Sequence, residues 1–503
     1  MQPDPTPFPI DHLALRGAEG DAALILRDRV LNHEALRSRV ALLAAWLAER
    51  VQERGARVAS WTAKGELTCL LPLAAARAGL VHVPINPLLK RAQVAHILAD
   101  SGARLLLGNA ARLGSLEGED LPAACVPIEE REVWRQAEAY GGCLGPSNAA
   151  ADELAAILYT SGSTGKPKGV MLSHANLWLG AASVAHYLKM AADDVTLAVL
   201  PLSFDYGQSQ LLSTWFAGGA VVPLDYLTPR DVVRACARHG VTTLAAVPPL
   251  WLQLVEQDWP GDATAAMRRL TNSGGALTET MVRGLRDAFP GARLFAMYGL
   301  TEAFRSTYLD PDLIDDHPTS MGVAIPFAEI LVLRGDGTVA APGEEGELVH
   351  CGPLVAQGYW RDAERTAERF RPAPPVSRYG GTAVWSGDRV VRDEAGLLHF
   401  VGRRDAMIKS SGNRISPAEI EQAALATGLA SEAVAIGVPD ERLGQAIHLV
   451  LRGEADDEAG LRDALKRALP GFMQPRTIEW REAMPLNPNG KIDRSALARE
   501  AGA

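Results

Sequence analysis

The chain has 503 residues, of which 47% are hydrophobic and 22% are charged, a composition typical of folded globular proteins. This length is more than one ordinary hydrophobic core supports, so about three domains or subdomains are expected. The 60 acidic residues outnumber the 50 basic ones, and the formal net charge is -10. This charge argues against a nucleic acid or an anionic membrane as the main partner, because both attract a basic face.

The cysteines and the apolar segments predict the compartment. The five cysteines are scattered, which disfavours a disulfide framework or a zinc site and indicates buried thiols in a reducing compartment. The N-terminal residues MQPDPTPFPIDH lack the pattern of a signal peptide. The most apolar stretch, residues 67–89, is interrupted by Arg77, His82, Pro84 and Pro87, which argues against a membrane span. We therefore expect a cytoplasmic enzyme without a membrane partner.

The first hundred residues alternate between short apolar runs and amphipathic stretches. The run AALIL precedes an amphipathic stretch at 31–55, and ARVASW and LVHVPINP are strand-like segments on either side of a helix-like segment at 67–79. Residues 97–109 repeat the helix, turn and strand pattern. Such alternation predicts a doubly wound α/β sheet. Residues 113–152 are less regular and are expected to include surface connections.

The pattern is clearer from residue 155 onward. A buried strand at 155–160, a glycine-rich loop and an amphipathic run at 174–188 are followed by strand-like runs at 195–202, 220–225, 242–248 and 292–299. Beyond Gly322, short β-like pieces separated by turns predict an antiparallel β subdomain that closes the large domain. About a hundred residues of new α/β alternation then follow, enough for a small domain. The change of pattern predicts a large domain at 1–402 and a small domain at 406–503, joined through residues 403–405.

The motif with the clearest chemistry is YTSGSTGKPKG at residues 159–169. Its glycines allow the backbone to bend with N–H groups pointing inward, and its hydroxyls and two lysines add donors that can surround a polyphosphate. It is not a Walker A loop, because Pro167 follows Lys166 where Ser or Thr would ligate magnesium. A flexible Ser/Gly linker is the alternative, but linkers rarely lie between a buried strand and an apolar helix.

This motif closely resembles the phosphate loop of the adenylate-forming superfamily, which includes acyl-CoA synthetases, peptide-synthetase adenylation domains and firefly luciferase. The resemblance continues in the same order over nearly the whole chain, through PLSFDYG, NSGGALT, MYGLTEA, GELVHCGPLVAQGYW, WSGDRV, GRRDAMIKSSGNRISPAEIE and MPLNPNGKIDR. It implies a large AMP-binding domain and a mobile C-terminal lid domain. It also implies activation of a carboxylic acid as an acyl adenylate, with ATP and Mg²⁺ as cofactors and a thiol as acyl acceptor.

The resemblance also implies the nucleotide site. Tyr298 stacks on adenine, Thr301 meets the phosphate and Glu302 holds Mg²⁺, a hard cation suited to oxygen ligands. Asp388 binds both ribose hydroxyls, since one carboxylate can accept from two O–H groups. Without the family context, residues 273–276 would be a plain turn and Asp388 a β-turn aspartate. The residues expected to bind ATP are Thr160, Ser161, Gly162, Ser163, Thr164, Gly165, Lys166, Lys168, Gly274, Gly275, Ala276, Tyr298, Gly299, Thr301, Asp388 and Arg403.

The C-terminal motif supplies the expected catalytic lysine. By the resemblance, Lys491 bridges the carboxylate and the α-phosphate during adenylation, where a compact cation is needed because two anions meet. Alone, such a lysine would be an ordinary surface charge. Asp405 is the expected hinge residue around which the small domain rotates. The residues expected to take part in catalysis are Lys491, Thr160 and Glu302, and no GxSxG elbow or Cys–His pair indicates a protein nucleophile.

The segment PLSFDYG bears on the substrate. Acyl-CoA synthetases usually carry Phe-His here, whereas this chain has Phe204-Asp205. In peptide-synthetase adenylation domains this aspartate binds the substrate α-amine, and a carboxylate in an apolar pocket needs a cation. The NPNGKIDR string is also similar to those domains. Both features favour an amino or imino acid loaded onto the phosphopantetheine of a carrier protein. The residues expected to contact the acid are Phe204, Asp205, Ser273, Met297 and Arg305.

Other features favour an acyl-CoA synthetase that joins a fatty or aryl acid to coenzyme A. IKSSGNRISPAEIE is more similar to those enzymes, and an Arg305–Asp205 pair would satisfy the aspartate without a substrate amine. SFDYG and LTEAFRSTYL are similar to exosortase-associated stand-alone ligases and, more distantly, to prolyl–carrier-protein ligases. An inactive binding protein is disfavoured because Lys491, Glu302 and Asp388 are all present. A luciferase-type oxygenase is the remaining alternative.

Overall fold

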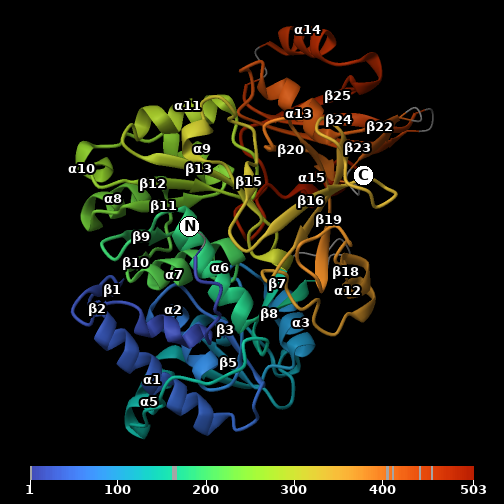
Figure 1. Cartoon of the computed structure of the whole chain (residues 1–503). Coiled ribbons are helices and arrows are strands. Elements are labelled where there is room, and N and C mark those ends of the chain that lie inside the picture. The colour runs from blue at the N-terminus through green and yellow to red at the C-terminus, as the bar shows by residue number, and fades with distance from the viewer. Residues whose placement is uncertain (1–2, 161–166, 404–406, 411–412, 441–442, 455–456) are drawn as a thin grey trace.

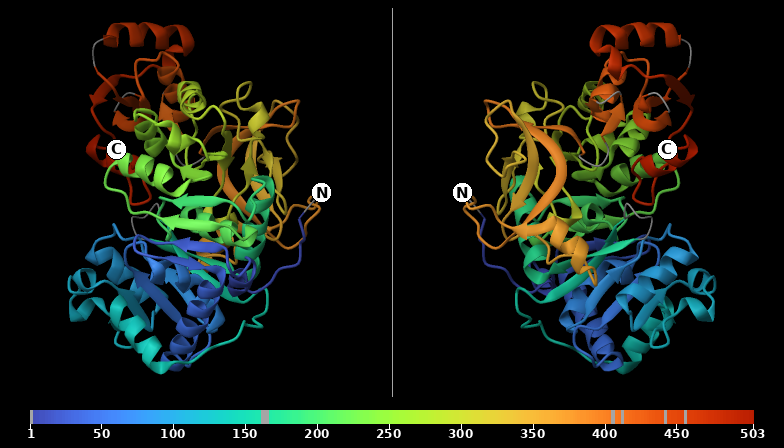
Figure 2. Two further views of the ribbon diagram at one scale, coloured as in Figure 1. Left: turned by 90° about the vertical axis from the view of Figure 1, so that its left-hand side faces the viewer. Right: turned by 90° about the vertical axis from the view of Figure 1, so that its right-hand side faces the viewer.

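The computed structural model describes residues 3–160, 167–403, 407–410, 413–440, 443–454 and 457–503. The chain forms a large N-terminal part and a smaller C-terminal part, which is coloured orange to red in Figure 1. In both side views of Figure 2 the C-terminal part lies at the end of the molecule opposite the first, blue segments. The predicted mixed α/β class, with a separate small C-terminal domain, is confirmed by this arrangement.

The first sheet of the large part has six strands in the order β6-β5-β3-β4-β7-β8. All its pairings are parallel except that of β7 with β8, and β4 and β5 are buried along their whole length, as expected for strands covered on both faces. The strands are β3 (Arg57–Trp61), β4 (Val81–Pro84), β5 (Leu105–Gly108), β6 (Val126–Glu129), β7 (Leu154–Thr160) and β8 (Lys168–Ser173). The accompanying helices are α1 (His33–Arg50), α2 (Glu66–Arg77), α3 (Arg91–Ser101), α4 (Ala110–Leu113) and α5 (Glu130–Tyr140).

Two local features of this sheet go beyond the sequence prediction. Residues 113–152, expected to include surface connections, contain loops together with the edge strand β6 and the helix α5. The glycine-rich loop was expected to run directly into a helix, but it joins β7 to an antiparallel partner, β8. Val170 and Leu172 of β8 are fully buried, which explains why this short segment pairs as a strand.

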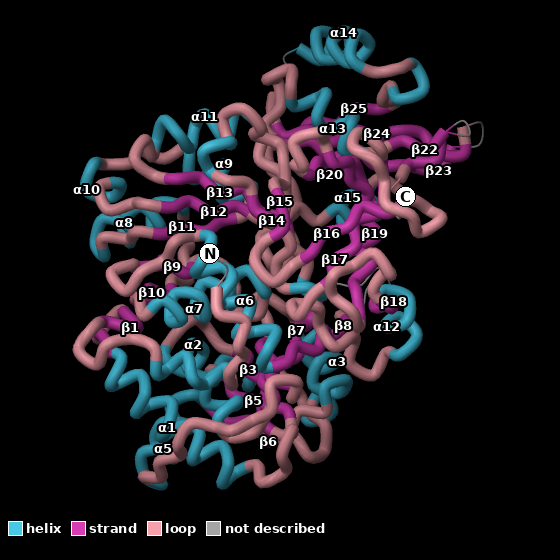
Figure 3. The backbone as a smooth tube through the Cα atoms, in the orientation of Figure 1, coloured by secondary structure: helices cyan, strands magenta, loops and turns pink. Residues whose placement is uncertain are grey.

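The second sheet has nine strands in the order β15-β14-β13-β12-β11-β9-β10-β1-β2, and its central strands are parallel. Figure 3 shows its magenta strands beside cyan helices. The strands are β1 (Ala22–Ile25), β2 (Val30–Asn32), β9 (Val195–Ala198), β10 (Ala220–Pro223), β11 (Thr243–Ala246), β12 (Arg269–Asn272), β13 (Arg293–Tyr298), β14 (Thr307–Tyr308) and β15 (Val323–Ala324). The helices are α6 (His174–Tyr187), α7 (Asp205–Ala217), α8 (Pro229–His239), α9 (Pro248–Val255), α10 (Gly261–Thr264) and α11 (Glu279–Ala288).

Helix α7 packs against this sheet through its buried face. Trp215 is fully buried and its indole N–H donates to the carbonyl of Ala23 in β1, at 2.9 Å. At the other end of the helix, Gly207 allows close contact with the preceding loop: a Cβ at this position would lie 2.0 Å from the carbonyl oxygen of Pro201. The first residue of α7, Asp205, is thereby fixed in position.

The third sheet closes the large part and is antiparallel throughout, as predicted. Its strands are β16 (Glu329–Leu333), β17 (Glu345–Cys351), β18 (Phe370–Pro372), β19 (Thr382–Arg392) and β20 (Leu398–Arg403), and helix α12 (Ala363–Arg369) lies beside them. Strand β19 is eleven residues long and pairs with β17, β18 and β20, so it forms the centre of this sheet.

The C-terminal part has a sheet and a hydrophobic core of its own. Its strands are β21 (Ile408–Ser410), β22 (Asn413–Ile415), β23 (Glu432–Asp440), β24 (Gly444–Arg452) and β25 (Thr477–Arg481). Its helices are α13 (Pro417–Leu425), α14 (Glu458–Ala468) and α15 (Arg494–Glu500). Sheet membership changes between Arg403 and Ile408, and the predicted hinge residue Asp405 lies outside the described residues. Among the described helices, none is long and apolar enough to cross a membrane.

Candidate active site

A cavity of about 880 Å³ lies where the large part meets the C-terminal part. Its walls come from the end of β7, the start of α7, the segment after β13, the β17–β19 sheet and the loop before α15. The structure brings together here the following predicted site residues: Thr160, Lys168, Phe204, Asp205, Ser273, Gly299, Thr301, Glu302, Arg305, Asp388, Arg403 and Lys491.

An adjoining cavity of about 260 Å³ contains the rest of the predicted residues that the structure describes. Its lining includes Gly274, Gly275, Ala276, Met297 and Tyr298. It shares Gly299, Asp388, Arg403 and Lys491 with the larger cavity, so the two spaces are continuous around these side chains. The predicted phosphate-loop residues Ser161, Gly162, Ser163, Thr164, Gly165 and Lys166 lie outside the described residues.

A hydrogen-bonded cluster lies at the end of the loop that joins β7 and β8. The ammonium of Lys168 donates to the Tyr359 hydroxyl at 2.7 Å and to Glu302 Oε1 at 3.2 Å, and the Tyr359 hydroxyl donates to the same Oε1 at 2.6 Å. The Thr160 hydroxyl is buried and has no hydrogen-bond partner among the residues that the structure describes. A buried hydroxyl in this state is available to a ligand in the cavity.

The pKa values of Glu302 and Lys168 depend on burial and on the charges beside them. Burial raises the pKa of the Glu302 carboxyl, but the Lys168 charge and the Tyr359 hydrogen bond outweigh it, and the pKa lies below its ordinary value. Burial lowers the pKa of Lys168. Glu302 is therefore a carboxylate at neutral pH, beside the loop that was expected to hold phosphate.

Tyr359 was missed by the sequence prediction. It lies in the QGYW segment of a block that the resemblance included, but nothing in the local pattern distinguishes its hydroxyl from that of a core tyrosine. Its ring is 2% exposed, and Lys168 Nζ lies 4.2 Å from the ring centroid. Tyr359 therefore holds both Lys168 and Glu302 in place.

The smaller cavity has a carboxylate, Asp388, among its lining residues. The Tyr298 hydroxyl donates to Asp388 Oδ2, and Arg403 Nε lies 3.5 Å from Asp388 Oδ1. Gly274 has φ +85°, and a Cβ there would lie 2.5 Å from Cε of Lys491. Only glycine fits, because it accepts this backbone conformation and leaves room for the lysine.

Lys491 reaches the cavity from the C-terminal part. Its ammonium lies 4.6 Å from the ring centroid of Phe204, a cation–π contact. The loop that carries it is held against the large part by Asn86, whose amide donates to Pro488 O at 2.8 Å and to Asn489 Oδ1 at 3.0 Å. Burial lowers the pKa of Lys491, and the nearby Asp205 carboxylate partly opposes this shift.

Asp205 and Arg305 lie deeper in the same cavity, and each is a buried charge. The Asp205 side chain accepts one hydrogen bond, from the Thr301 hydroxyl at 3.1 Å. The Arg305 guanidinium donates to Ser273 Oγ at 3.1 Å and lies 4.5 Å from the ring centroid of Tyr206. The alternative in which Arg305 and Asp205 form an ion pair is not what the structure shows. Over the described residues, neither side chain makes an ion pair.

Burial of Asp205 makes its negative charge energetically costly. The carboxyl is 5% exposed, and burial raises its pKa although Arg305 and Lys491 attract the charged form from a distance. Its place in the first turn of α7 favours a negative charge, because the helix dipole is positive there. The site thus presents a carboxylate that gains from a directly bound cation.

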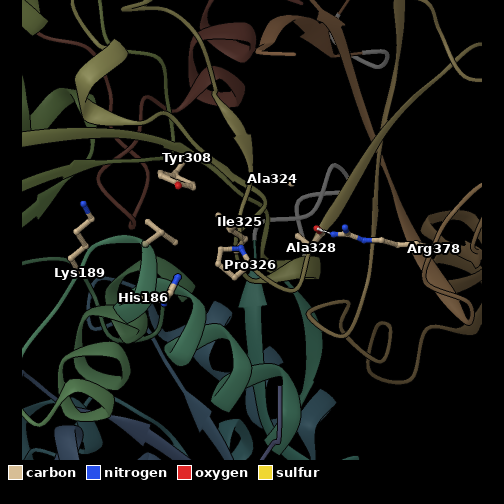
Figure 4. A pocket seen from close by; sticks show the side chains of 9 residues that line it. His186, Lys189, Tyr308, Ala324, Ile325, Pro326, Ala328 and Arg378 are labelled. Carbon is tan, nitrogen blue, oxygen red and sulfur yellow. Dashed lines mark hydrogen bonds between the residues drawn. The ribbon is translucent and has the colours of Figure 1, made fainter. Parts of the chain in front are cut away.

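Two further spaces lie behind Arg305. An inner cavity of about 20 Å³ is lined by Arg305, Tyr206, Ser209, Gln210 and Tyr187, among others. The Tyr187 ring stacks on Tyr308 with centroids 4.6 Å apart. Beyond this tyrosine pair is an outer surface pocket of about 300 Å³, around which Figure 4 shows His186, Lys189, Tyr308 and Arg378.

Comparison with known proteins agrees with this geometry. Residues 12–360 match the family model of the AMP-binding enzymes, and residues 419–491 match that of the AMP-binding enzyme C-terminal domain. The chain is 33% identical over 500 residues to an L-proline–[L-prolyl-carrier protein] ligase of Streptomyces coelicolor, covering 94% of this chain and 92% of the relative. It is 29% identical over 491 residues to a feruloyl-CoA synthase of an Amycolatopsis species, covering 94% of each.

Solved structures show the same similarity. ATP-bound MatB from Rhodopseudomonas palustris superposes with a TM-score of 0.89 at 26% identity, covering 98% of this chain and 99% of the other. The o-succinylbenzoate CoA synthetase of Bacillus subtilis, in complex with its acyl-adenylate intermediate, gives a TM-score of 0.83 at 26% identity and 98% coverage of each chain. The adenylate-forming superfamily that the motifs resemble is thus confirmed, and the chain belongs to the family of AMP-binding enzymes.

Proposed function

We propose that this AMP-forming ligase uses ATP to activate an amino or imino acid and then passes the aminoacyl group to the phosphopantetheine thiol of a carrier protein. Similarity to prolyl–carrier-protein ligases over nearly the whole chain supports the class of reaction. The single observation that carries the substrate class is Asp205, a buried carboxylate at the cavity wall that no cation of the described residues contacts.

An ammonium group of the substrate would satisfy this carboxylate. A buried ion without a partner is costly, and burial accordingly raises the pKa of Asp205. Binding of an α-amine there supplies the missing cation and places the carboxylate carbon two bonds from the amine nitrogen. Lys491 lies on the same side of the cavity, close to Phe204 and to Asp205. The acid can therefore be held at both ends of its amino-acid moiety.

In the first half-reaction the carboxylate oxygen attacks the α-phosphorus of ATP, the bond to pyrophosphate breaks, and an aminoacyl adenylate forms. We assign Lys491 to bring the two anions together and to offset the charge that builds on phosphorus. Thr160 and Lys168 are assigned to the phosphates, Tyr298 to the adenine and Asp388 to the ribose. Catalysis then consists of positioning and electrostatics rather than of a covalent protein intermediate.

Glu302 fits a magnesium site of the kind that nucleotide enzymes use. Mg²⁺ is commonly held by one or two carboxylates together with substrate phosphates, and Glu302 is ionised beside the phosphate loop. In the described part of the chain, no three His, Cys, Asp or Glu side chains gather into a metal site of their own. Bound Mg²⁺ would supply charge neutralisation of the phosphates, and Glu302 is the residue that would hold it.

In the second half-reaction the thiol sulfur attacks the acyl carbon, AMP leaves, and a thioester forms. Lys491 lines the cavity in this structure, and the C-terminal part that carries it is proposed to move so that a thiol can reach the acyl group. We propose that the large domain spans 1–402, that the hinge at 403–405 includes Asp405, and that residues 406–503 rotate as a lid. The AMP-binding C-terminal model matches within this last range.

The test is acid-dependent ATP–pyrophosphate exchange over a panel of amino, fatty and aryl acids. We expect exchange only with acids that carry an α-amine or imine. Thioester formation is then followed with a phosphopantetheinylated carrier protein and with coenzyme A as competing acceptors, and the carrier is expected to be preferred. Exchange with fatty or aryl acids alone, followed by transfer to coenzyme A, would identify an acyl-CoA synthetase instead.

A further inference from the structure

Arg305 is a buried cation that the proposed reaction does not use. Its side chain is 2% exposed, and its Nε has no hydrogen-bond partner among the described residues. The guanidinium contacts the Ser273 hydroxyl and the Tyr206 ring, but no carboxylate of the described chain pairs with it. Buried arginines ordinarily have an anionic partner, and this one faces a cavity instead.

The backbone holds Arg305 in this position at a cost. The preceding residue, Phe304, has φ 58° and ψ −72°, a combination that bulky residues rarely adopt. Strain of this kind persists where the surrounding structure fixes it, and it gathers at binding sites. Here the Phe304 ring packs against Gly180, where a Cβ would lie 2.6 Å from the ring. The turn therefore directs Arg305 inward rather than toward solvent.

Arg305 stands between the main cavity and a small inner space. Arg305 lines the main cavity on one side and the inner cavity of about 20 Å³ on the other. That inner volume is enough for about one water-sized group. It is bordered by Gln210, whose buried amide nitrogen and oxygen have no partner in the described ranges, and it ends at the Tyr187–Tyr308 stack. A long apolar side chain does not fit this environment.

We infer that the substrate is an amino acid whose short side chain ends in a carboxylate, and that Arg305 binds this second carboxylate. The inference rests on the proposed function, in which Asp205 takes the α-amine and Lys491 the reacting carboxylate. Asp205, Arg305 and Lys491 then each meet one opposite charge of the substrate. The planar guanidinium group of Arg305 suits the binding of a carboxylate, because it can donate two parallel hydrogen bonds to it. A neutral side chain, such as that of proline, leaves Arg305 unpaired.

Two sets of four acids separate this inference from the proposed function. The first set is aspartate, 2-aminobutyrate, succinate and butyrate, and the second is glutamate, norvaline, glutarate and pentanoate. Within each set, the first and third acids differ only in the amine. The first and second acids differ only in the distal carboxylate, which a methyl group replaces. With the unmodified enzyme, we expect exchange with aspartate or glutamate to exceed that with the matched neutral amino acid by about thirty-fold or more in kcat/KM.

The outcomes are distinct. Equal or faster exchange with 2-aminobutyrate, norvaline or proline than with the acidic amino acids would overturn the inference and leave the proposed function standing. Exchange with succinate or glutarate equal to that with the amino counterpart would overturn the proposed function, and with it the amino-acid part of the inference.

An arginine variant tests the residue itself. Arg305→Met keeps an unbranched side chain that reaches as far as Nε and removes the charged group, so the preference for the acidic amino acid should fall to near unity while KM for ATP is unchanged. Arg378→Met is the matched control, because Arg378 borders the outer pocket in Figure 4, and it should keep the wild-type preference. A preference unchanged in Arg305→Met would contradict the assignment, and the wild-type comparison decides the matter if this variant does not fold.

Discussion

Buried charges dominate the site at the scale of single residues. Asp205 and Arg305 are buried and Lys491 is partly buried in one cavity, yet none is neutralised by a direct ion pair within the described residues. Groups of this kind cost stability in the empty enzyme and bind ligand charges strongly, because the surroundings are poorly solvated. The arrangement indicates that substrate charges complete the site.

The first prediction concerns the stability cost of Asp205. Folding raises the pKa of Asp205 above its ordinary value of 3.8. Between the unfolded and the folded pKa the folded protein therefore binds more protons than the unfolded one, and its stability falls as pH rises through this range. Asp205→Asn removes this loss and should raise the thermal midpoint of the empty enzyme at neutral pH. Thermal melts should show the difference shrinking as pH approaches 3.8. A lower midpoint for the variant at neutral pH would indicate that Asp205 stabilises the fold through Arg305.

The second prediction concerns Lys491. Lys491→Ala should reduce acid-dependent exchange by about two orders of magnitude or more, since it removes a charge contact to the transition state. Thioester formation from pre-made acyl adenylate should be affected far less. The two rates are measured separately on one preparation. An equal loss of both would show that Lys491 supports the fold or both conformations.

Site residues in continuous motifs could be predicted from the sequence, whereas those fixed only by tertiary packing could not. Lys168, Glu302 and Lys491 stand in recognisable strings, and the structure places all three in one cavity. Tyr359 could not be recognised, because its contact with Glu302 joins residues 57 positions apart. The sequence also could not predict whether the Asp205 carboxylate is paired, because this depends on the distance between Asp205 and Arg305 in the folded chain.

At the scale of elements, the start of α7 determines where the acid binds. Phe204 and Asp205 precede and begin the helix, and their position depends on close packing between Gly207 and the carbonyl of Pro201. The α/β alternation predicted this helix-and-strand order. The strand β8 and the β6–α5 segment were not predicted, because short or weakly apolar segments become regular only through pairing with neighbours.

The third prediction tests this packing. Gly207→Ala would place a Cβ 2.0 Å from the Pro201 oxygen, so the loop before α7 must move. We expect a destabilisation of about 1–3 kcal/mol in chemical unfolding and a higher KM for the acid. Gly284→Ala in α11 is the control, because its Cβ would meet only ordinary contacts at 3.6 Å and alanine favours the helix. If both variants behave alike, the close contact at Gly207 does not position the site.

At the scale of the whole molecule, the C-terminal part contributes a reacting group to a cavity built by the large part. Asn86 bonds the lysine loop, and Arg452 Nη2 lies 3.9 Å from Glu256 Oε1 across the same boundary. Such sparse polar contacts suit an interface that opens and closes. The small domain was predictable from the change of pattern after residue 402, but its docked position was not.

The fourth prediction concerns the movement of this part. Asp405→Pro fixes φ in the predicted hinge and should trap one arrangement of the C-terminal part. We expect one half-reaction to be retained and the other to be impaired, as measured by exchange and by thioester formation from pre-made adenylate. Normal rates in both assays would remove Asp405 from the hinge.

The central claim is that Asp205 receives the amine of the substrate. The most direct measurement is the ratio of kcat/KM in ATP–pyrophosphate exchange for an amino acid and its des-amino counterpart, in the wild type and in Asp205→Asn. The account predicts a large ratio in the wild type that falls by about thirty- to thousand-fold in the variant, with KM for ATP unchanged. A wild-type ratio near one, or a ratio that Asp205→Asn leaves intact, would contradict it.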